Sequence, residues 1–203
     1  MKLILPTYVL KPFFPAPPPK LQVDEDIKLL ALRPQDADPL YKLVDSNRAY
    51  LEAWLPWAWQ MQQLHDIKHF IKQLRFRDVY SGRWVFGIWH QGNLVGLIDF
   101  NEGDKTQSKV GVGYWIAKQY QGKGIVSRAV QRWVDYVFES ETVKKVHIKC
   151  ATSNERSQAV ARRMGFELAY IEPPVEVLPG QHQSLKVFAM TAKEWQARQW
   201  TMA

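Results

Sequence analysis

The amino-acid sequence predicts a mixed α/β fold in which helices pack on one sheet. Two observations predict this class. Apolar runs of strand length lie in the middle of the chain and are joined by a short turn, which indicates antiparallel strands. Strand and helix patterns then alternate from Lys109 onward. The chain has 203 residues, of which 46% are hydrophobic, and this suits one packed domain.

The first 26 residues are expected to form a proline-rich arm ahead of the domain. Residues 12–19 read PFFPAPPP, and proline cannot donate to a helix or sheet ladder. The arm is either a proline-rich recognition segment or a lead-in that docks on the domain through Phe13 and Phe14. The domain itself is expected over residues 27–203, where no linker or repeat interrupts the pattern.

The domain is expected to begin with one strand and two helices. Ile27–Leu32 is an apolar run of strand length, and Asp36 is placed to cap a helix that reaches about Asn47. The tryptophan-rich segment Leu51–Trp59 is expected to be irregular. Asp66–Tyr80 is expected to be a helix, because apolar residues recur there at helical spacing, namely Ile67, Phe70, Ile71 and Leu74.

Three strands are expected to follow as an antiparallel meander. Trp84–Trp89 and Leu94–Phe100 are apolar runs joined by Gln91-Gly92-Asn93, which is typical of a hairpin turn. Lys109–Ala117 is the third strand, and its residues alternate between two faces. These strands therefore predict the antiparallel part of the sheet.

A helix and a sharply alternating strand come next. The helix ends near Glu139 and carries one apolar stripe. Lys145–Ala151 is a strand with Val146, Ile148 and Cys150 on its inner face. Its other face is expected to be solvated or to border an anion, and it consists of Lys145, His147 and Lys149.

The last third of the chain is expected to contain two helices and two strands. A helix is expected over Asn154–Met164 and a strand over Phe166–Ile171. Pro173–Gln183 is expected to be a loop, since it begins with two prolines. Ser184–Met190 is expected to be the last strand, and Thr191 to cap a C-terminal helix.

The composition excludes several classes of protein. The single Cys150 excludes a disulfide framework and a four-cysteine zinc site. His65 and His69 share a helical face without a zinc motif around them, so no metal is expected. No run of about 18 apolar residues is present, and the first residues lack a signal peptide. We therefore expect a cytoplasmic protein without a membrane-spanning helix.

The net charge is +7, from 27 Lys and Arg against 20 Asp and Glu. A basic balance fits a polyanionic ligand or nucleic acid. The sequence contains no recognised nucleic-acid-binding module, so a direct contact with RNA is not expected. The positive charge also weighs against polycationic acceptors, which it would repel.

The strongest local signal is Gln119-Tyr120-Gln121-Gly122-Lys123-Gly124, which lies between a strand and a helix. Two glycines allow backbone conformations that converge N–H groups, and the helix start adds further N–H groups and a positive dipole. This arrangement predicts a phosphate or pyrophosphate site, with an ordinary glycine-rich turn as the alternative. The spacing excludes a P-loop, and Ser127 stands where the dinucleotide fingerprint needs glycine.

The same residues, from Gln119 to Gly124, resemble the coenzyme-A pyrophosphate loop of the GNAT superfamily of N-acetyltransferases. The resemblance extends over about Ile27 to Trp195. Three more segments resemble the Rim-type branch, which acetylates ribosomal proteins. They are Asn47-Arg48-Ala49-Tyr50-Leu51 with Trp54-Leu55-Pro56-Trp57, then Gly113-Tyr114-Trp115-Ile116, and Asn154-Glu155-Arg156-Ser157 with Ala161-Arg162-Arg163-Met164-Gly165-Phe166.

The resemblance implies a mostly antiparallel sheet, with helices on both faces, that splits in a V between Lys109–Ala117 and Lys145–Ala151. It implies that acetyl-CoA lies in the split and that no metal takes part. The pyrophosphate would meet backbone N–H groups of the loop, and the pantetheine would pair with the strand edge and with Asn154. The implied coenzyme-binding residues are Trp115, Ile116, Ala117, Gln121, Gly122, Lys123, Gly124, Ile125, Asn154 and Ser157.

The chemistry implied is direct attack of a neutral amine on the thioester. Many members of the superfamily use a tyrosine as the acid, and Ala161 stands at that position here. Ser157 is the implied replacement, as a hydrogen-bond donor to sulfur, and helix capping is its alternative role. Asp99 is the candidate for deprotonating the amine through water, with Glu102 and Glu52 as other candidates. A paired or edge-exposed Asp99 is an equally open interpretation.

The implied acceptor is a protein N-terminal α-amine, such as that of a ribosomal protein. Its pKa of about 7.7–8.0 leaves a useful neutral fraction near pH 7, unlike lysine at about 10.4. Glu52, Trp54 and Trp57 are expected to border the acceptor. The alternatives are acetylation of a small amine, such as an antibiotic or a polyamine, and a non-catalytic acyl-CoA sensor. The arm could also serve a homodimer interface.

Overall fold

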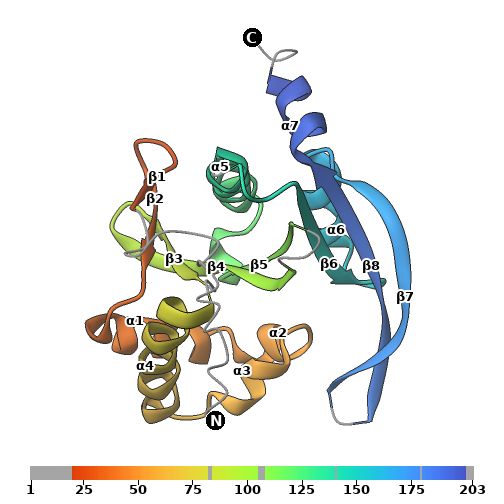
Figure 1. Cartoon of the computed structure of the whole chain (residues 1–203). Coiled ribbons are helices and arrows are strands. Elements are labelled where there is room, and N and C mark those ends of the chain that lie inside the picture. The colour runs from red at the N-terminus through yellow and green to blue at the C-terminus, as the bar shows by residue number, and fades with distance from the viewer. Residues whose placement is uncertain (1–19, 82–83, 105–107, 140, 179, 200–203) are drawn as a thin grey trace, which may run out of the picture.

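The computed structural model describes residues 20–81, 84–104, 108–139, 141–178 and 180–199. The predicted docking of Phe13 and Phe14 lies outside these residues. Eight strands form one sheet in the order β1-β2-β3-β4-β5-β6-β8-β7 (Figure 1). The strands are β1 Leu21–Gln22, β2 Ile27–Ala31, β3 Val85–His90, β4 Asn93–Asp104, β5 Lys109–Ile116, β6 Lys145–Ala151, β7 Glu167–Leu178 and β8 Gln181–Thr191.

Helices lie on both faces of the sheet, as predicted. α5 covers one face, and the group α1 to α4 covers the other face of the N-terminal half (Figure 1). The α-helices are α1 Ala37–Asp45, α2 Arg48–Glu52, α3 Pro56–Gln60, α4 Leu64–Ser81, α5 Ile125–Glu139, α6 Glu155–Arg163 and α7 Ala192–Gln199. Two short 3₁₀ helices are η1 Pro34–Asp36 and η2 Lys118–Tyr120.

The sheet splits between β5 and β6, which is the only parallel pair among the described strands. Their register covers Lys109–Gly111 opposite Lys145–His147. Beyond these residues β5 continues to Ile116 and β6 to Ala151 without pairing to each other. The predicted V-shaped split is therefore present, and it opens toward the carboxyl ends of both strands.

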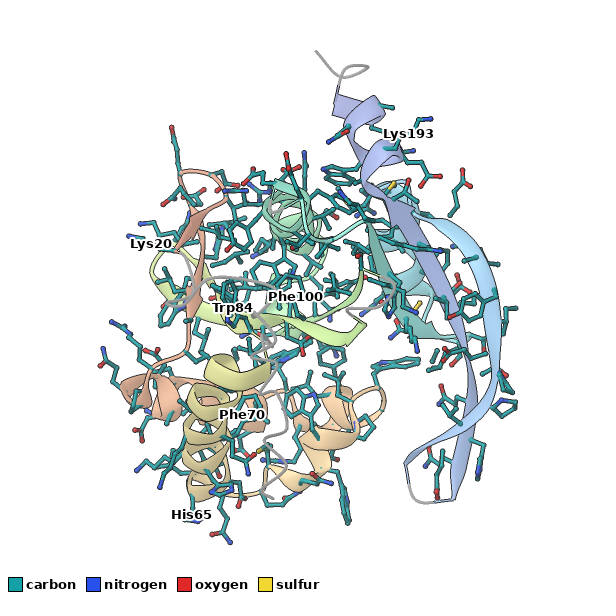
Figure 2. The ribbon with its side chains drawn as sticks, in the orientation of Figure 1. Lys20, His65, Phe70, Trp84, Phe100 and Lys193 are labelled. Carbon is teal, nitrogen blue, oxygen red and sulfur yellow. The ribbon has the colours of Figure 1, made fainter. Side chains whose placement is uncertain are left out.

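A large aromatic core fixes α5 against the sheet. Trp133 of α5 is fully buried and lies 4.6 Å from Phe86 and 4.3 Å from Phe100, between ring centroids. Figure 2 shows Trp84 and Phe100 in the middle of the molecule. Burying aromatic rings of this size supplies much of the apolar area of a domain core. The helix start at Ile125 is thereby held rigidly at the open end of β5.

β4 and β5 approach each other closely at Gly96. A Cβ atom at position 96 would lie 2.1 Å from the backbone oxygen of Trp115. Only glycine fits such a contact, since backbone atoms cannot give way as a flexible side chain can. Gly96 therefore determines how the end of β5 lies against its neighbour.

Two segments differ from the sequence predictions in their secondary structure. Leu51–Trp59 was expected to be irregular, but it contributes to two short helices, α2 and α3, with Pro56 at the first position of α3. Proline suits that position because its missing N–H would have no partner there. The strand β1 was not predicted at all, although Leu21 is buried against the core.

The predicted loop Pro173–Gln183 is instead most of a long hairpin. β7 runs to Leu178 and β8 begins at Gln181. The two prolines fall where the register shifts between Glu172 and Val175, and β7 is the outer strand of the sheet. Proline is tolerated at bulges and on edge strands, where no ladder N–H is needed. The prolines therefore interrupt the ladder without ending the strand.

The outer face of β6 also differs from its prediction. His147 is 2% exposed, so that face is not fully solvated. Its register partners are Gly111 on β5 and Ala189 on β8. Small neighbours on both sides leave room for an imidazole ring on the sheet surface. Cys150, on the inner face, is buried in the main core as predicted.

Candidate active site

The glycine-rich loop joins the end of β5 to α5 and has the conformation that the sequence predicts. Gly122 and Gly124 have positive φ angles of 75° and 71°. Residues 122–124 are exposed, whereas Ile125 is buried as the first residue of α5. A 15-residue helix therefore presents its first N–H groups beside an exposed loop. This arrangement fits a pyrophosphate, because unpaired N–H groups and the helix dipole both favour anions.

Arg128 supports the loop from within α5. One guanidinium nitrogen, Nη2, donates to the backbone oxygen of Lys123 at 3.3 Å. The other, Nη1, forms a 2.7 Å ion pair with Asp24 in the turn between β1 and β2. The turn that follows the unpredicted strand β1 therefore helps to hold Arg128 against the loop.

Asn47 connects the first residues of the loop region to helix α1. Its side-chain oxygen accepts a hydrogen bond from the backbone N–H of Lys118 at 2.8 Å. Its Nδ2 donates to the backbone oxygen of Leu43 at 2.9 Å. The residue is 5% exposed, so both bonds lie in a largely dry environment, where unpaired polar groups are costly.

Tyr50 of α2 fastens the end of β5. Its hydroxyl donates to the backbone oxygen of Ile116 at 2.9 Å. Burial raises the pKa of Tyr50, while a side-chain hydrogen bond with Gln121 and the charge of Arg156 lower it. The hydroxyl therefore stays protonated and remains a donor at neutral pH.

The backbone at the end of β5 presents one N–H to the split. The N–H of Ala117 donates to the backbone oxygen of Val95 at 2.8 Å, so it belongs to the β4 ladder. Backbone groups of successive strand residues point alternately to the two neighbouring strands. The N–H of Ile116 therefore points away from β4, toward the side where β6 diverges. Of the predicted edge residues Trp115, Ile116 and Ala117, Ile116 is the one placed to meet a ligand in the split.

α6 begins at the other wall of the split. The side-chain oxygen of Asn154 accepts from the N–H of Ser157 at 3.1 Å and caps the helix. Gln158 is fully buried and donates to the backbone oxygens of Ala151 and Thr152 at 3.2 and 2.8 Å. The predicted residues Asn154 and Ser157 are therefore held against the end of β6.

Ser157 lies beside two other polar side chains. The Tyr114 hydroxyl is 3.1 Å from Ser157 Oγ and also 3.1 Å from the Ser157 backbone oxygen. Burial raises the pKa of the Cys150 thiol, and the nearby Ser157 side chain lowers it. Burial likewise raises the pKa of Tyr114, so its phenol is neutral.

The remaining predicted residues occupy the face of the sheet that carries α1 to α4. Asp99 pairs in register with Gly113 and is half-buried. Trp57 packs on Trp115 with ring centroids 5.9 Å apart, whereas Trp54 is 37% exposed. Glu52 lies 3.9 Å from the Arg48 guanidinium, and the side chain of Glu102 is outside the described residues.

Sequence reasoning missed the roles of Asn47, Tyr50 and Tyr114. All three stand inside motifs that the sequence analysis quoted, but their contacts join residues 71, 66 and 43 positions apart. Periodicity shows on which face of a helix or strand a residue lies, but it does not show which distant residue that side chain contacts. A tyrosine at an otherwise apolar, inward position was the one available signal.

Among the described residues, no group of three or more His, Cys, Asp and Glu side chains could hold a metal ion. Within the described ranges, no helix is long and apolar enough to cross a membrane.

Comparison with known proteins agrees with this site. YdaF of Bacillus subtilis (strain 168), named as a candidate ribosomal N-acetyltransferase, is 30% identical over 86% of this chain and 96% of its own length. The ribosomal-protein-serine acetyltransferase of Escherichia coli (strain K12) is 27% identical over 83% and 94%. The crystal structure of the microcin C7 self-immunity acetyltransferase MccE, with acetyl-CoA and AMP, has a TM-score of 0.81 and 26% identity, covering 84% of this chain and 95% of that one.

The family described as acetyltransferase (GNAT) domain matches residues 26–167, which include both walls of the split and the glycine-rich loop. The relatives cover nearly their full lengths, so the likeness is not confined to the loop. Acetyl-CoA, bound in the MccE structure, is also the ligand that the loop, the Ile116 N–H and the α5 start suit. This chain belongs to the GNAT family of acetyltransferases.

Proposed function

We propose that this acetyltransferase transfers the acetyl group of acetyl-CoA to the N-terminal α-amine of a protein, and that a ribosomal protein is its natural acceptor. The supporting observation is the open end of the β5–β6 split, where the glycine loop and the start of α6 lie on opposite walls. The names of the two bacterial relatives supply the acceptor class. A ribosomal-protein acceptor would place the reaction in the cytoplasm.

The binding residues divide along the coenzyme. Backbone N–H groups of Gln121 to Gly124, with Ile125 at the helix start, would hold the pyrophosphate, and Lys123 adds a positive charge. The edge at Ile116 would pair with the pantetheine, whose amide would also meet Asn154. The Ile116 N–H would polarise the thioester carbonyl, as donors to a developing oxyanion do.

The chemical step is a direct displacement. The amine nitrogen attacks the acetyl carbon, an N–C bond forms, the C–S bond breaks and its electron pair goes to sulfur. Ser157 Oγ–H would stabilise the sulfur anion by a hydrogen bond, and water would accept the proton lost by the amine. Asp99 would assist that loss through water.

The acceptor side would use the face with α2 and α3. Trp54 offers an exposed ring, and Trp57 is backed by Trp115. Glu52 would attract the acceptor ammonium before it loses its proton, although Arg48 lies beside it. An N-terminal α-amine needs little help from a base, because its pKa of about 7.7–8.0 lies near physiological pH.

The test is turnover of acetyl-CoA, read as free thiol release, against peptides and small amines. The panel contains peptides that begin with Ser or Ala, the same peptides with blocked N-termini, and spermidine. We expect turnover on the free peptides and at least tenfold less on the other acceptors. Turnover on spermidine alone would replace the protein acceptor with a small amine.

Ser157→Ala tests the proposed thiolate stabilisation. We expect kcat to fall about tenfold or more, the scale of one transition-state hydrogen bond, with little change in the KM for acetyl-CoA. Ser184→Ala on β8 is the matched control and should retain wild-type kcat. Tight binding of acetyl-CoA without turnover on any acceptor would favour an acyl-CoA sensor instead.

A further inference from the structure

Tyr114 lies on β5 and approaches Ser157 of α6 from the opposite wall of the split. Its hydroxyl lies 3.1 Å from Ser157 Oγ and 3.1 Å from the Ser157 backbone oxygen. The ring packs against the main core, so its position is set by the sheet and not by solvent. Tyr114 therefore holds its hydroxyl at one fixed point next to the serine.

A serine hydroxyl has one proton and rotates freely, so its neighbours decide where it donates. The Asn154 side chain uses its oxygen on the Ser157 N–H and so fixes the backbone rather than the hydroxyl. The Tyr114 phenol is within hydrogen-bond distance of the hydroxyl itself. The Cys150 thiol, which Ser157 also influences, is a weaker hydrogen-bonding group than a phenol.

The phenol has one proton and two acceptors within reach, the Ser157 backbone oxygen and Ser157 Oγ. When it donates to Oγ, it occupies one lone pair of that oxygen and leaves the serine proton for another acceptor. Tyr114 is neutral because burial raises its pKa, so it keeps the proton needed for this bond across the working pH range. The raised pKa also makes Tyr114 a poor acid, and no proton needs to leave it. Its contribution would be orientation and polarisation of the serine hydroxyl.

We propose that Tyr114 is a positioning residue for acetyl transfer, which directs the Ser157 hydroxyl proton toward the sulfur of coenzyme A. The proposal rests on the proposed function, in which Ser157 donates to that sulfur. In this proposal the phenol comes from β5, across the split from α6. Ala161 of α6 stands at the position where many members of the superfamily have a tyrosine. Tyr114 thus links the strand that would bind the pantetheine to the serine that would stabilise the departing thiolate.

A purely structural role makes a different prediction, and a double-mutant cycle separates the two. Tyr114→Phe removes only the hydroxyl. In the Ser157→Ala background the phenol can still donate to the backbone oxygen of residue 157, so a structural cost would persist there. An effect that acts through the serine hydroxyl would disappear in that background.

The experiment measures kcat and the KM for acetyl-CoA in the wild type, Tyr114→Phe, Ser157→Ala and the double variant. We expect Tyr114→Phe to lower kcat about fivefold to tenfold with a KM change below twofold, and to lower it less than twofold in the Ser157→Ala background. Equal losses in both backgrounds, or a change confined to KM, would overturn the proposal. Wild-type kcat in Ser157→Ala would also overturn it, while acetyl transfer itself would stand.

Two further variants serve as a control and as an alternative to Tyr114→Phe. Tyr136→Phe makes the same chemical change in a half-buried tyrosine that packs on the same core, and it should leave kcat within twofold of wild type. If Tyr114→Phe fails to fold, 3-fluorotyrosine at position 114 keeps the ring and a more acidic hydroxyl, and it should match or exceed wild-type kcat. A tenfold loss with 3-fluorotyrosine would contradict the proposal. Failure of every variant and the wild type to turn over any amine would refute the proposed function, and with it the role of Tyr114.

Discussion

The side-chain oxygen of Asn47 accepts a hydrogen bond from the backbone N–H of Lys118, 71 residues later in the chain. This bond joins the turn between α1 and α2 to the start of the coenzyme loop. Tyr50, one turn further along, holds the backbone oxygen of Ile116. The helices on the acceptor side therefore set the position of the strand end and loop on which the coenzyme would lie.

Asn47→Ala should weaken the loop and the fold together. The change removes the partner of the part-buried Lys118 N–H and one of the two donors to the Leu43 oxygen, which costs about 1–3 kcal/mol. We expect a lower free energy of unfolding by urea denaturation and a severalfold higher KM for acetyl-CoA. Asn93→Ala, in the exposed hairpin turn, is the control and should change neither quantity. An unchanged KM in Asn47→Ala would show that the loop keeps its binding conformation without the hydrogen bond from Lys118 to Asn47.

Gly124→Ala should raise the dissociation constant of acetyl-CoA. The φ of 71° disfavours any residue with a Cβ by roughly 1–2 kcal/mol, although no heavy atom lies within 4 Å of the added methyl. Gly180→Ala is a matched control, because Gly180 has φ 74° and equally open space in the turn between β7 and β8. We expect similar losses of stability but weaker acetyl-CoA binding in Gly124→Ala alone, measured by calorimetry. Equal binding in both variants would argue against the loop as the pyrophosphate site.

The two tryptophans of α3 and Trp54, which lies between α2 and α3, should separate acceptor binding from packing. Trp57→Ala removes a ring that packs on Trp115 and should destabilise the protein by about 0.5–3 kcal/mol. Trp54→Ala should leave the melting temperature unchanged and raise the KM of a peptide acceptor severalfold. Trp59→Ala removes a ring that is 57% exposed and serves as the surface control. A rise in peptide KM in Trp59→Ala and not in Trp54→Ala would move the acceptor site along α3.

Cys150 should react slowly with thiol reagents in the folded protein. Burial raises its thiol pKa, and the thiolate is the reactive form. We expect iodoacetamide at pH 7.5 to alkylate the folded protein at least tenfold more slowly than the urea-unfolded protein. Because the Ser157 hydrogen bond lowers this pKa, Ser157→Ala should slow the reaction further. Since the chain has a single cysteine, intact-mass spectrometry reads the result directly; faster alkylation in Ser157→Ala would contradict the contact.

Stability should fall in alkali. Burial raises the pKa values of Tyr50, Tyr114 and Tyr136 in the folded state above the usual tyrosine value of about 10. Above pH 10 the unfolded chain releases tyrosine protons that the folded chain retains, so the stability present below pH 10 is lost as pH rises further. Urea denaturation between pH 8 and 11 should show this decline, and Tyr114→Phe should make it shallower. A flat profile would mean that these hydroxyls ionise without unfolding.

The sequence predicted the loop well because its conformation is local. Gly122 and Gly124 adopt the positive φ angles that their spacing suggested, and α5 begins directly after them. The cap of α7 was equally local, since Thr191 Oγ1 accepts from the Glu194 N–H as predicted from its position. Such features depend on neighbours within a few residues and are readable from sequence alone.

Features that depend on tertiary context were read less well. Pro173 and Pro174 normally end strands, yet they fit because β7 lies at the sheet edge with a bulge, a place that no local pattern reveals. The burial of His147 depends on the packing over its face of the sheet, which its own segment does not reveal. The contact of Tyr114 with Ser157 required the β5–β6 pairing to be known first. Such features depend on which strands lie next to each other in the sheet, and the sequence of one segment does not reveal its neighbours.

The short pairing of β5 with β6 has a mechanical consequence. Three register pairs join β5 to β6, and beyond Gly111 the two halves of the sheet are connected by side-chain contacts such as Tyr114 with Ser157. A coenzyme bound in the split would contact both walls and so add a reversible connection between the two halves of the sheet. Free coenzyme at a concentration of about 100 times its dissociation constant adds roughly 2.7 kcal/mol to the free energy of unfolding. The protein is therefore expected to be more stable with the coenzyme bound than after coenzyme A departs.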